Sequence, residues 1–192
     1  MNDNGILFIL SGPSGIGKNT VINELRTKLG GRLFHSISYT TRSPRNKEVN
    51  GTDYYFISKE EFAKKIKDDA FLEYADYVNE WYGTPKKPVI DNLAQGKFVV
   101  LDIEVDGALK IIKSYKDCIS CFLFPDDIEL LRYRLTKRGD VSLDKIEKRI
   151  NEYHIERVMF DKYNFCLCGD DAVKNAEQIL MLVDLEIKYR KD

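Results

Sequence analysis

The stretch GPSGIGKNT at residues 12–20 constrains the fold of this chain more than any other. It contains the spacing G-x-x-x-x-G-K, in which glycines let backbone N–H groups turn toward an anion and the lysine reaches phosphate oxygens. The apolar run GILFILS precedes it at 5–11, and KNTVINELRTKL follows at 18–29 with a helical pattern. Strand, glycine turn and helix are the context that a phosphate-binding loop requires, so the sequence predicts such a loop here.

One position in this loop departs from the usual pattern. The lysine is normally followed by Ser or Thr, whose hydroxyl helps to hold Mg²⁺. Here Asn19 follows Lys18, and the first hydroxyl is that of Thr20. The sequence therefore raises the question of whether Thr20 takes the metal side of the loop.

Most of the remaining chain alternates apolar strands with helices. Strands are expected for FVVLDI (98–103), CISCFLF (118–124) and FCLC (165–168). Helices are expected after Gly107, over 126–137, over 143–160 and from 172 toward the C-terminus. Strands separated by helices predict an α/β fold with a parallel sheet and helices on both faces.

The segment between residues 34 and 84 has a different pattern. FHSISYTTR (34–42), DYYFIS (53–58), FLEYADY (71–77) and EWYGT (80–84) are short, alternating and aromatic. Such runs are typical of strands in a sheet with one solvated face. Ser58 and Glu61 form a capping box, which predicts a helix between the second and third runs. We interpret this segment as an insertion with its own small mixed or antiparallel sheet.

Composition and cysteine spacing narrow the class of protein. The chain has 192 residues and a net charge of −1, with 30 basic and 31 acidic residues. The length predicts a single domain, and the balance of charges predicts no general attraction to nucleic acid or membrane. The apolar run near the N-terminus is too short to span a bilayer, so we expect a cytoplasmic protein. Cys118-x-x-Cys121 and Cys166-x-Cys168 suggest zinc, but alternation along a strand would point Cys118 and Cys121 apart. We interpret the cysteines as small buried hydrophobes.

Several charged residues have positions suited to phosphate chemistry. Asp102 ends an apolar strand, where a carboxylate can hold Mg²⁺, and Glu104 lies two residues further on the same face. Arg134 and Arg138 share one helix face, and Arg149 lies on the next helix. Two such helices could close over a polyphosphate and neutralise its charge.

The inserted segment offers a second anion site. Arg42 and Arg45 lie close to Ser38 in the sequence, and Tyr54 and Tyr82 occur in neighbouring strands. Two guanidinium groups beside tyrosines suit a monophosphate. Glu73 interrupts the apolar side of its strand. A carboxylate in a pocket can accept two parallel hydrogen bonds, such as those from N1–H and the 2-amino group of guanine, although periodicity alone shows only an acid in an unusual place.

Together these motifs resemble the guanylate kinase family. GPSGIGK, SYTTRSPR, EVNGTDYYF, FLEYA, YGTP, LDIEVDGA, RLTKRG and IEKR occur in the family's order and spacing, and the resemblance covers nearly the whole chain. It implies a P-loop NTPase core over 1–35, 87–125 and 159–192. It also implies a GMP-binding insertion over 36–86 and a helical lid over 126–158.

The resemblance further implies an activity and a set of site residues. The reaction would be ATP + GMP = ADP + GDP, with dGMP as a second acceptor, Mg²⁺ bound with ATP, and a role in purine nucleotide metabolism. The protein would be a monomer or homodimer without nucleic-acid or membrane partners. The family pattern assigns ATP to Gly12, Pro13, Ser14, Gly15, Ile16, Gly17, Lys18, Asn19 and Thr20. It assigns GMP to Ser38, Arg42, Arg45, Tyr54, Glu73, Tyr82, Thr84 and Glu104. It assigns phosphoryl transfer to Lys18, Arg134, Arg138 and Arg149, and the metal to Thr20 and Asp102.

The chain departs from the family pattern at a few positions. Glu104, Asp106 and Gly169 stand where the family usually has Asp, Gln and Asn, which puts the fine geometry near GMP, Mg²⁺ and adenine in question. The family accepts Gly as well as Ser after the lysine, so we interpret Asn19 as a variation inside a working site. Two alternatives stay open: a non-catalytic module that binds phosphorylated partners, and a P-loop kinase with another acceptor. Retention of Lys18 and Asp102 disfavours the first, and Glu73 with Ser38 and Thr84 disfavours the second.

Overall fold

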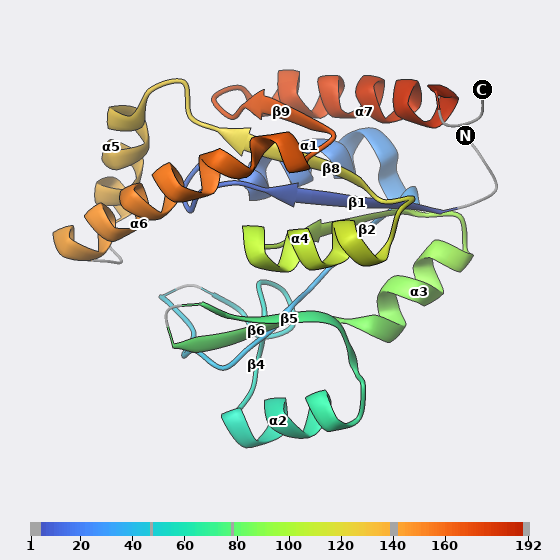
Figure 1. The fold of residues 1–192 in the computed structure, drawn as a ribbon, viewed down its shortest axis with the longest axis horizontal. Helices are drawn as coiled ribbons and strands as arrows, with labels where there is room; N and C mark the ends of the chain where they lie inside the picture. The colour runs from blue at the N-terminus through green and yellow to red at the C-terminus, as the bar shows by residue number, and fades with distance from the viewer. Residues whose placement is uncertain (1–4, 47, 78, 139–141, 190–192) are drawn as a thin grey trace.

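Two sheets organise the structure, a computed structural model that describes residues 5–46, 48–77, 79–138 and 142–189 (Figure 1). The larger sheet is parallel, with the strand order β2-β7-β1-β8-β9. Its strands are β1 (Ile6–Ser11), β2 (Leu33–Ser36), β7 (Phe98–Asp102), β8 (Ile119–Phe124) and β9 (Phe165–Cys168). The predicted parallel α/β sheet is confirmed, and β1 at its centre leads directly into the glycine loop.

Helices cover both faces of the parallel sheet. The helices of the chain are α1 (Lys18–Leu29), α2 (Lys59–Lys67), α3 (Lys86–Ala94), α4 (Val105–Ser114), α5 (Ile128–Arg138), α6 (Leu143–Glu156) and α7 (Ala172–Tyr189). On one face, α1 and α7 bury Leu25 and Ile179 against Phe8 and Leu10 of β1. On the other face, α4 buries Ile111 in a cluster that contains Ile9 of β1. Alternate side chains along the strands thus pack into two separate hydrophobic clusters, one on each face of the sheet.

The same alternation separates the first two cysteines. Cys118 belongs to the cluster on the α4 side, and Cys121 belongs to the cluster on the α1 side. The two thiols therefore point to opposite faces of the sheet, as the strand pattern predicts. Among the described residues, no group of three or more His, Cys, Asp or Glu side chains is arranged to hold a metal ion.

The smaller sheet has the order β4-β3-β6-β5 and lies below the larger one in Figure 1. Its strands are β3 (Tyr39–Thr40), β4 (Tyr55–Phe56), β5 (Phe71–Tyr77) and β6 (Glu80–Pro85). Strand β3 pairs parallel to β4 and antiparallel to β6, so the sheet is mixed. Helix α2 packs Phe62 against Phe71, and the capping box at Ser58 and Glu61 is confirmed, with both hydrogen bonds formed.

Three predicted elements differ from the structure. FHSISYTTR is not one strand: Leu33–Ser36 joins the parallel sheet as β2, because Leu33 and Phe34 pack against the two core clusters, and only Tyr39–Thr40 joins the small sheet. The helix expected after Gly107 begins at Val105, so Gly107 lies in its first turn. The helix expected over 143–160 ends at Glu156 and continues as a 3₁₀ turn over Arg157–Lys162. Helix α3 was not predicted at all.

Helices α5 and α6 pair at one end of the molecule, on the left in Figure 1. They share a small apolar cluster of Leu131, Leu135, Ile146 and Ile150. The turn between them, residues 139–141, lies outside the described residues. Over the part of the chain that the structure describes, every helix is too short or too polar to cross a bilayer.

Candidate active site

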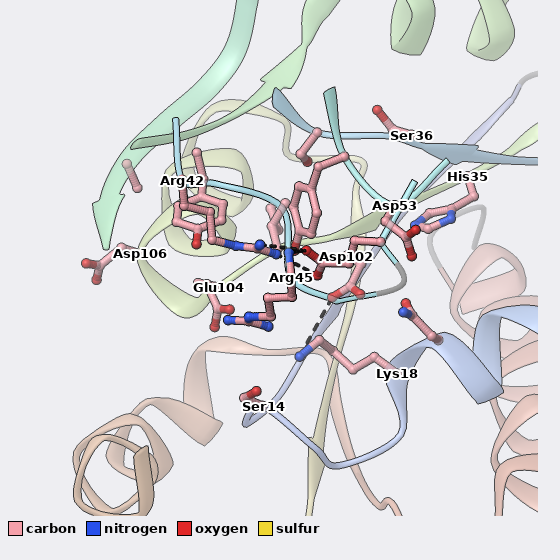
Figure 2. A pocket seen from close by; sticks show the side chains of 18 of the residues that line it. Ser14, Lys18, His35, Ser36, Arg42, Arg45, Asp53, Asp102, Glu104 and Asp106 are labelled. Carbon is pink, nitrogen blue, oxygen red and sulfur yellow. Dashed lines mark hydrogen bonds and ion pairs between the residues drawn. The ribbon is translucent and has the colours of Figure 1, made fainter. Parts of the chain in front are cut away.

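A cavity of about 340 Å³ lies between the carboxyl ends of the parallel strands, the glycine loop, the small sheet and α6 (Figure 2). It brings together most of the residues that the sequence singled out. From the predicted set, the cavity is lined by Ser14, Gly15, Gly17, Lys18, Asn19, Ser38, Arg42, Arg45, Tyr54, Glu73, Tyr82, Asp102, Glu104 and Arg149.

The loop between β1 and α1 has the backbone geometry of an anion site. Gly15 and Gly17 have φ values of 90° and 108°, a left-handed region that favours glycine. Helix α1 begins directly after Gly17, so its N-terminus points its dipole at the cavity. Within the described helix, the first turn carries neither a side-chain cap nor an acidic residue. An incoming anion therefore meets the helix N-terminus without a competing carboxylate from that turn.

Lys18 links the loop to the end of β7. Its Nζ donates a hydrogen bond to the Gly12 carbonyl at 2.6 Å and lies 3.7 Å from Asp102 Oδ1, and in Figure 2 the side chain extends toward Asp102. Burial alone would lower the pKa of Lys18, but the carboxylates of Asp102, Glu104 and Glu156 outweigh it, so its pKa is raised. The lysine is consequently a fixed positive charge near neutral pH.

Carboxylates outnumber Lys18 in this part of the site. Burial raises the pKa of Glu104, helped by the charges of Asp102 and Glu152 and opposed by Lys18. Burial and the repulsion of Glu104 together raise the pKa of Glu156, on α6, to about 8. Glu156, which is not among the residues that line the cavity, thus keeps a proton to a higher pH than an ordinary carboxyl group.

Arg42 is held in place by Glu48 and Tyr54. Its Nη1 and Nη2 donate to the two carboxylate oxygens of Glu48 at 2.7 and 2.8 Å, and its guanidinium lies 5.0 Å from the centre of the Tyr54 ring. Glu48 also accepts a hydrogen bond of 2.7 Å from the backbone N–H of Arg45. Burial raises the pKa of Glu48, but these hydrogen bonds more than offset it, and the pKa is lowered. Glu48 therefore fixes the guanidinium of Arg42 and the backbone of Arg45 in one short turn.

A bulge in β5 decides where Glu73 points. Phe71 is opposite Pro85 on β6, but Glu73 is opposite Thr84, so Leu72 is an extra residue on β5. Adjacent residues on β6 face opposite sides of the sheet, which places Phe71 and Glu73 on opposite sides as well. Phe71 consequently packs on Phe62 of α2, and Glu73 lines the cavity.

The Glu73 carboxylate is buried and held by one neighbour. Its Oε1 accepts a hydrogen bond from Thr84 Oγ1 at 2.7 Å, and only 8% of the residue is exposed. Burial raises the pKa of Glu73, and the hydrogen bond from Thr84 opposes that rise. Thr84 is fully buried and acts on the cavity through Glu73 rather than by lining it.

Part of the predicted set lies beside a second hollow on the other side of the loop. Gly15, Ile16, Gly17 and Thr20 line it together with Arg134 of α5, and Arg134 Nη1 lies 3.0 Å from Asp170 Oδ1. Arg134 and Thr20 thus reach the loop from the side opposite Asp102. Of the remaining residues, Gly12 and Pro13 are buried within the loop, and the Arg138 side chain lies outside what the structure describes.

Gly169, where the family pattern has Asn, also lines this second hollow. A Cβ at position 169 would lie 2.5 Å from Ile16 Cγ1. The bulk of Ile16 therefore explains the glycine, because no larger residue fits unless Ile16 moves.

The cavity is also lined by residues that the sequence did not assign to a site, among them His35, Ser36, Glu48 and Asp53. His35 and Ser36 are the last residues of β2. Ligands bind at the carboxyl ends of parallel strands, and because β2 was assigned to the small sheet, these two residues were not expected there. Burial lowers the pKa of His35, so this imidazole is neutral near pH 7. Glu48 had a usable signal, since an acid three residues after Arg45 is a natural partner for an arginine pair.

The donor set beside Lys18 suits a hard cation. Asp102 presents a carboxylate with 21% of its side chain exposed, and Asn19 adds an amide on the same cavity wall. Magnesium is commonly bound through one or two carboxylates, several waters and substrate phosphates, without a complete protein cage. Asp102 at the end of β7 fits that mode.

Comparison with known proteins gives a consistent family. A profile of the guanylate kinase family matches residues 5–184 of the chain. Among solved structures, the guanylate kinase of Anaplasma phagocytophilum is similar, with a TM-score of 0.80 and 28% sequence identity, over 96% of this chain and 87% of that one. Because the family match extends over nearly the whole sequence, this chain belongs to the guanylate kinase family and is a kinase.

Proposed function

We propose that the protein transfers the γ-phosphoryl group of ATP to GMP, and to dGMP, to give ADP and GDP or dGDP. The observation that supports this proposal is that one cavity joins the phosphate loop and Lys18 to the buried Glu73 carboxylate and to the Arg42–Arg45 turn. A donor and an acceptor nucleotide can therefore meet end to end. The proposal includes a role in purine nucleotide metabolism in the cytoplasm, by a monomer or homodimer.

Glu73 is the proposed reader of the acceptor base. Its carboxylate can accept hydrogen bonds from N1–H and the 2-amino group of guanine, whereas adenine presents an acceptor at N1 that would repel it. Thr84 donates a hydrogen bond to this carboxylate, and Ser38 and Glu104 line the same cavity. This arrangement favours GMP over AMP, because the wrong base would leave a buried carboxylate without its partners.

The acceptor phosphate is assigned to the four residues Arg42, Arg45, Tyr54 and Tyr82, which line the cavity on the small-sheet side. Glu48 keeps Arg42 in place, and the stacking of Arg42 on Tyr54 restricts it further. A preorganised guanidinium loses less conformational entropy when a phosphate arrives. The acceptor is thus held at both its base and its phosphate.

The donor side is assigned to the loop over residues 12–20. Its backbone N–H groups would bind the ATP phosphates, and Lys18 would stabilise the negative charge that develops on the transferred phosphoryl group. Arg134, Arg138 and Arg149, from α5 and α6, would add positive charge as those helices approach. We place Mg²⁺ with ATP beside Asp102, where it would neutralise phosphate charge; Thr20, the other residue that the family pattern assigns to the metal, lies beside the second hollow.

Movement of α5 and α6 would exclude water from the reacting groups. The two helices carry their own apolar cluster, so they can move as one unit. We propose this unit, residues 126–158, as a lid over the core, with residues 36–86 as the acceptor-binding part. Closure of the lid protects ATP from transfer to water.

The decisive experiment is a coupled assay for ADP formation with Mg-ATP and GMP, dGMP, AMP, CMP or UMP as acceptor. Turnover with GMP and dGMP, and at most a small fraction of it with the others, supports the proposal. Turnover that favours another acceptor would overturn the GMP assignment but leave a P-loop kinase. A purely interacting module would give no ADP with any acceptor.

A further inference from the structure

Gly107 lies closer to Glu73 than any residue with a side chain could. It occupies the first turn of α4, and a Cβ at this position would lie 2.6 Å from Glu73 Oε2 and 3.0 Å from Glu73 Cδ. Both residues are buried. In a helix interior, glycine is otherwise unfavourable compared with alanine. The close approach of the carboxylate is the physical reason for a glycine here.

Both sides of this contact are held by neighbours, and the part that can shift is the Glu73 carboxylate, at the end of its side chain. Glu73 is fixed at Oε1 by the 2.7 Å hydrogen bond from Thr84. Helix α4 is fixed against β5 by Lys110, whose Nζ donates to the Tyr74 carbonyl at 2.5 Å, and by the bulge residue Leu72, which packs into the same cluster as Val105. An added methyl group would therefore move the carboxylate itself.

We infer that Gly107 is a specificity-determining position of the acceptor site, because its missing side chain lets Glu73 Oε2 lie where it can receive the donor edge of guanine. This inference rests on the proposed function and adds a positioning residue, which also lines the cavity. Helix α4 lies between the parallel sheet and the small sheet, so Gly107 couples the placement of the two sheets to the choice of base (Figure 1).

A double-mutant cycle of Gly107→Ala and Glu73→Asp tests the inference. Aspartate withdraws the carboxylate by one methylene and makes room for the methyl group of alanine. We expect Gly107→Ala to weaken GMP binding by about tenfold or more, as the loss of a charge-assisted hydrogen bond does, with ATP affinity changed less than about twofold. In the Glu73→Asp background, the same Gly107→Ala change should cost much less GMP affinity. Calorimetry with GMP alone, and KM values for GMP and ATP, measure these effects.

Gly83→Ala is the matched control. A Cβ at Gly83 would also be too close to its neighbours, at 2.8 Å from the Phe71 ring and 2.9 Å from Phe62, but on the opposite face of the small sheet. We expect this variant to lower the unfolding temperature without any coupling to Glu73→Asp. General damage to the small sheet would instead give the same coupling for both glycines.

The cycle is also run on the free protein by thermal unfolding. Because alanine propensity cancels in the cycle, Gly107→Ala should be better tolerated with Asp than with Glu at position 73. If the wild type bound no GMP, the proposed function would fail, while this ligand-free cycle would still decide the contact. If the wild type bound GMP and Gly107→Ala bound it equally well, the inference would fail and the proposed function would stand. Additive losses in both cycles would also overturn it.

Discussion

At one end of the cavity, Lys18 and the loop before it come from one short segment, whereas at the other end Glu73 depends on the hairpin of β5 and β6 and on α4, which begins about 20 residues later in the sequence. The loop needs only a strand, its glycines and the start of α1. Glu73 needs the pairing of β5 with β6, the hydrogen bond from Thr84 and the approach of α4 at Gly107.

Because of this difference, we expect substitutions at the two ends of the cavity to impair the protein in different ways. A substitution of Lys18 removes a charge but leaves the conformation of the loop in place. A change at the Glu73 end can act from either side of the sheet, because several contacts share the task of positioning. The predictions below separate the two ends, beginning with the largest effect.

Lys18→Ala should abolish most turnover and leave acceptor binding intact. Removing a group that stabilises transition-state charge lowers kcat by about 100-fold to 1,000-fold or more. The GMP dissociation constant, measured by calorimetry without ATP, should change less than about twofold, because Glu73 and Arg42 supply that binding. Lys28→Ala is the control, since Lys28 lies on the same helix and pairs with the exposed Glu177. A large loss of GMP affinity in Lys18→Ala would remove the proposed division between the ends.

Glu73→Ala should do the opposite. Loss of the carboxylate removes both base contacts, so GMP affinity should fall by about 100-fold. ATP affinity should be unchanged in fluorescence or calorimetric titrations, because the loop is intact. The KM for GMP should rise, and the preference for GMP over AMP should decrease. Unchanged GMP binding would mean that another group reads the base.

Thr84→Val should give a smaller and pH-dependent effect. The loss of one hydrogen bond to Glu73 should weaken GMP binding by about tenfold. Because that bond opposes the rise in the pKa of Glu73, its loss raises the pKa further. The charged carboxylate is the form that accepts both donors, so GMP affinity should fall as pH falls, and this fall should begin at a higher pH in Thr84→Val than in the wild type. GMP titrations from pH 5 to pH 8 measure the shift, and coincident profiles would contradict it.

Glu156→Gln should have the smallest effect, seen in stability rather than turnover. The pKa of Glu156 is raised to about 8 in the folded protein, so the folded state holds a proton that the unfolded state releases at its ordinary value of about 4.3. The contribution of this group to stability is present at low pH and is lost as pH rises toward 8. Glutamine removes that dependence.

Urea unfolding at pH 5.5 and pH 8.5 measures this difference. The loss of stability between the two pH values should be smaller in Glu156→Gln than in the wild type. Glu177→Gln, a change at an exposed carboxylate, should leave the wild-type difference in place. An equal pH dependence in all three proteins would show that Glu156 does not carry the effect.

The sequence predicted the parallel sheet, the loop, the capping box at Ser58 and most of the cavity wall. These features follow from local patterns, since apolar runs, glycine spacing and capping residues act over a few neighbours. It did not predict that Leu33–Ser36 belongs to the parallel sheet, because that depends on packing against both core clusters. It also did not predict that Arg134 and Thr20 lie beside a different hollow from Asp102.

By itself the sequence determined the loop over residues 12–18, because its glycine spacing, the strand before it and the helix after it are local patterns. Only the tertiary structure decided the direction of Glu73. An uninterrupted alternation would place Glu73 on the same face as Phe71, and the extra residue Leu72 reverses this only when β5 pairs with β6. Likewise, Gly107 has no visible role until α4 is packed against the small sheet. The register of paired strands and the close approach of separate segments exist only in the folded chain. The position of Glu73, the proposed reader of the base, depends on both.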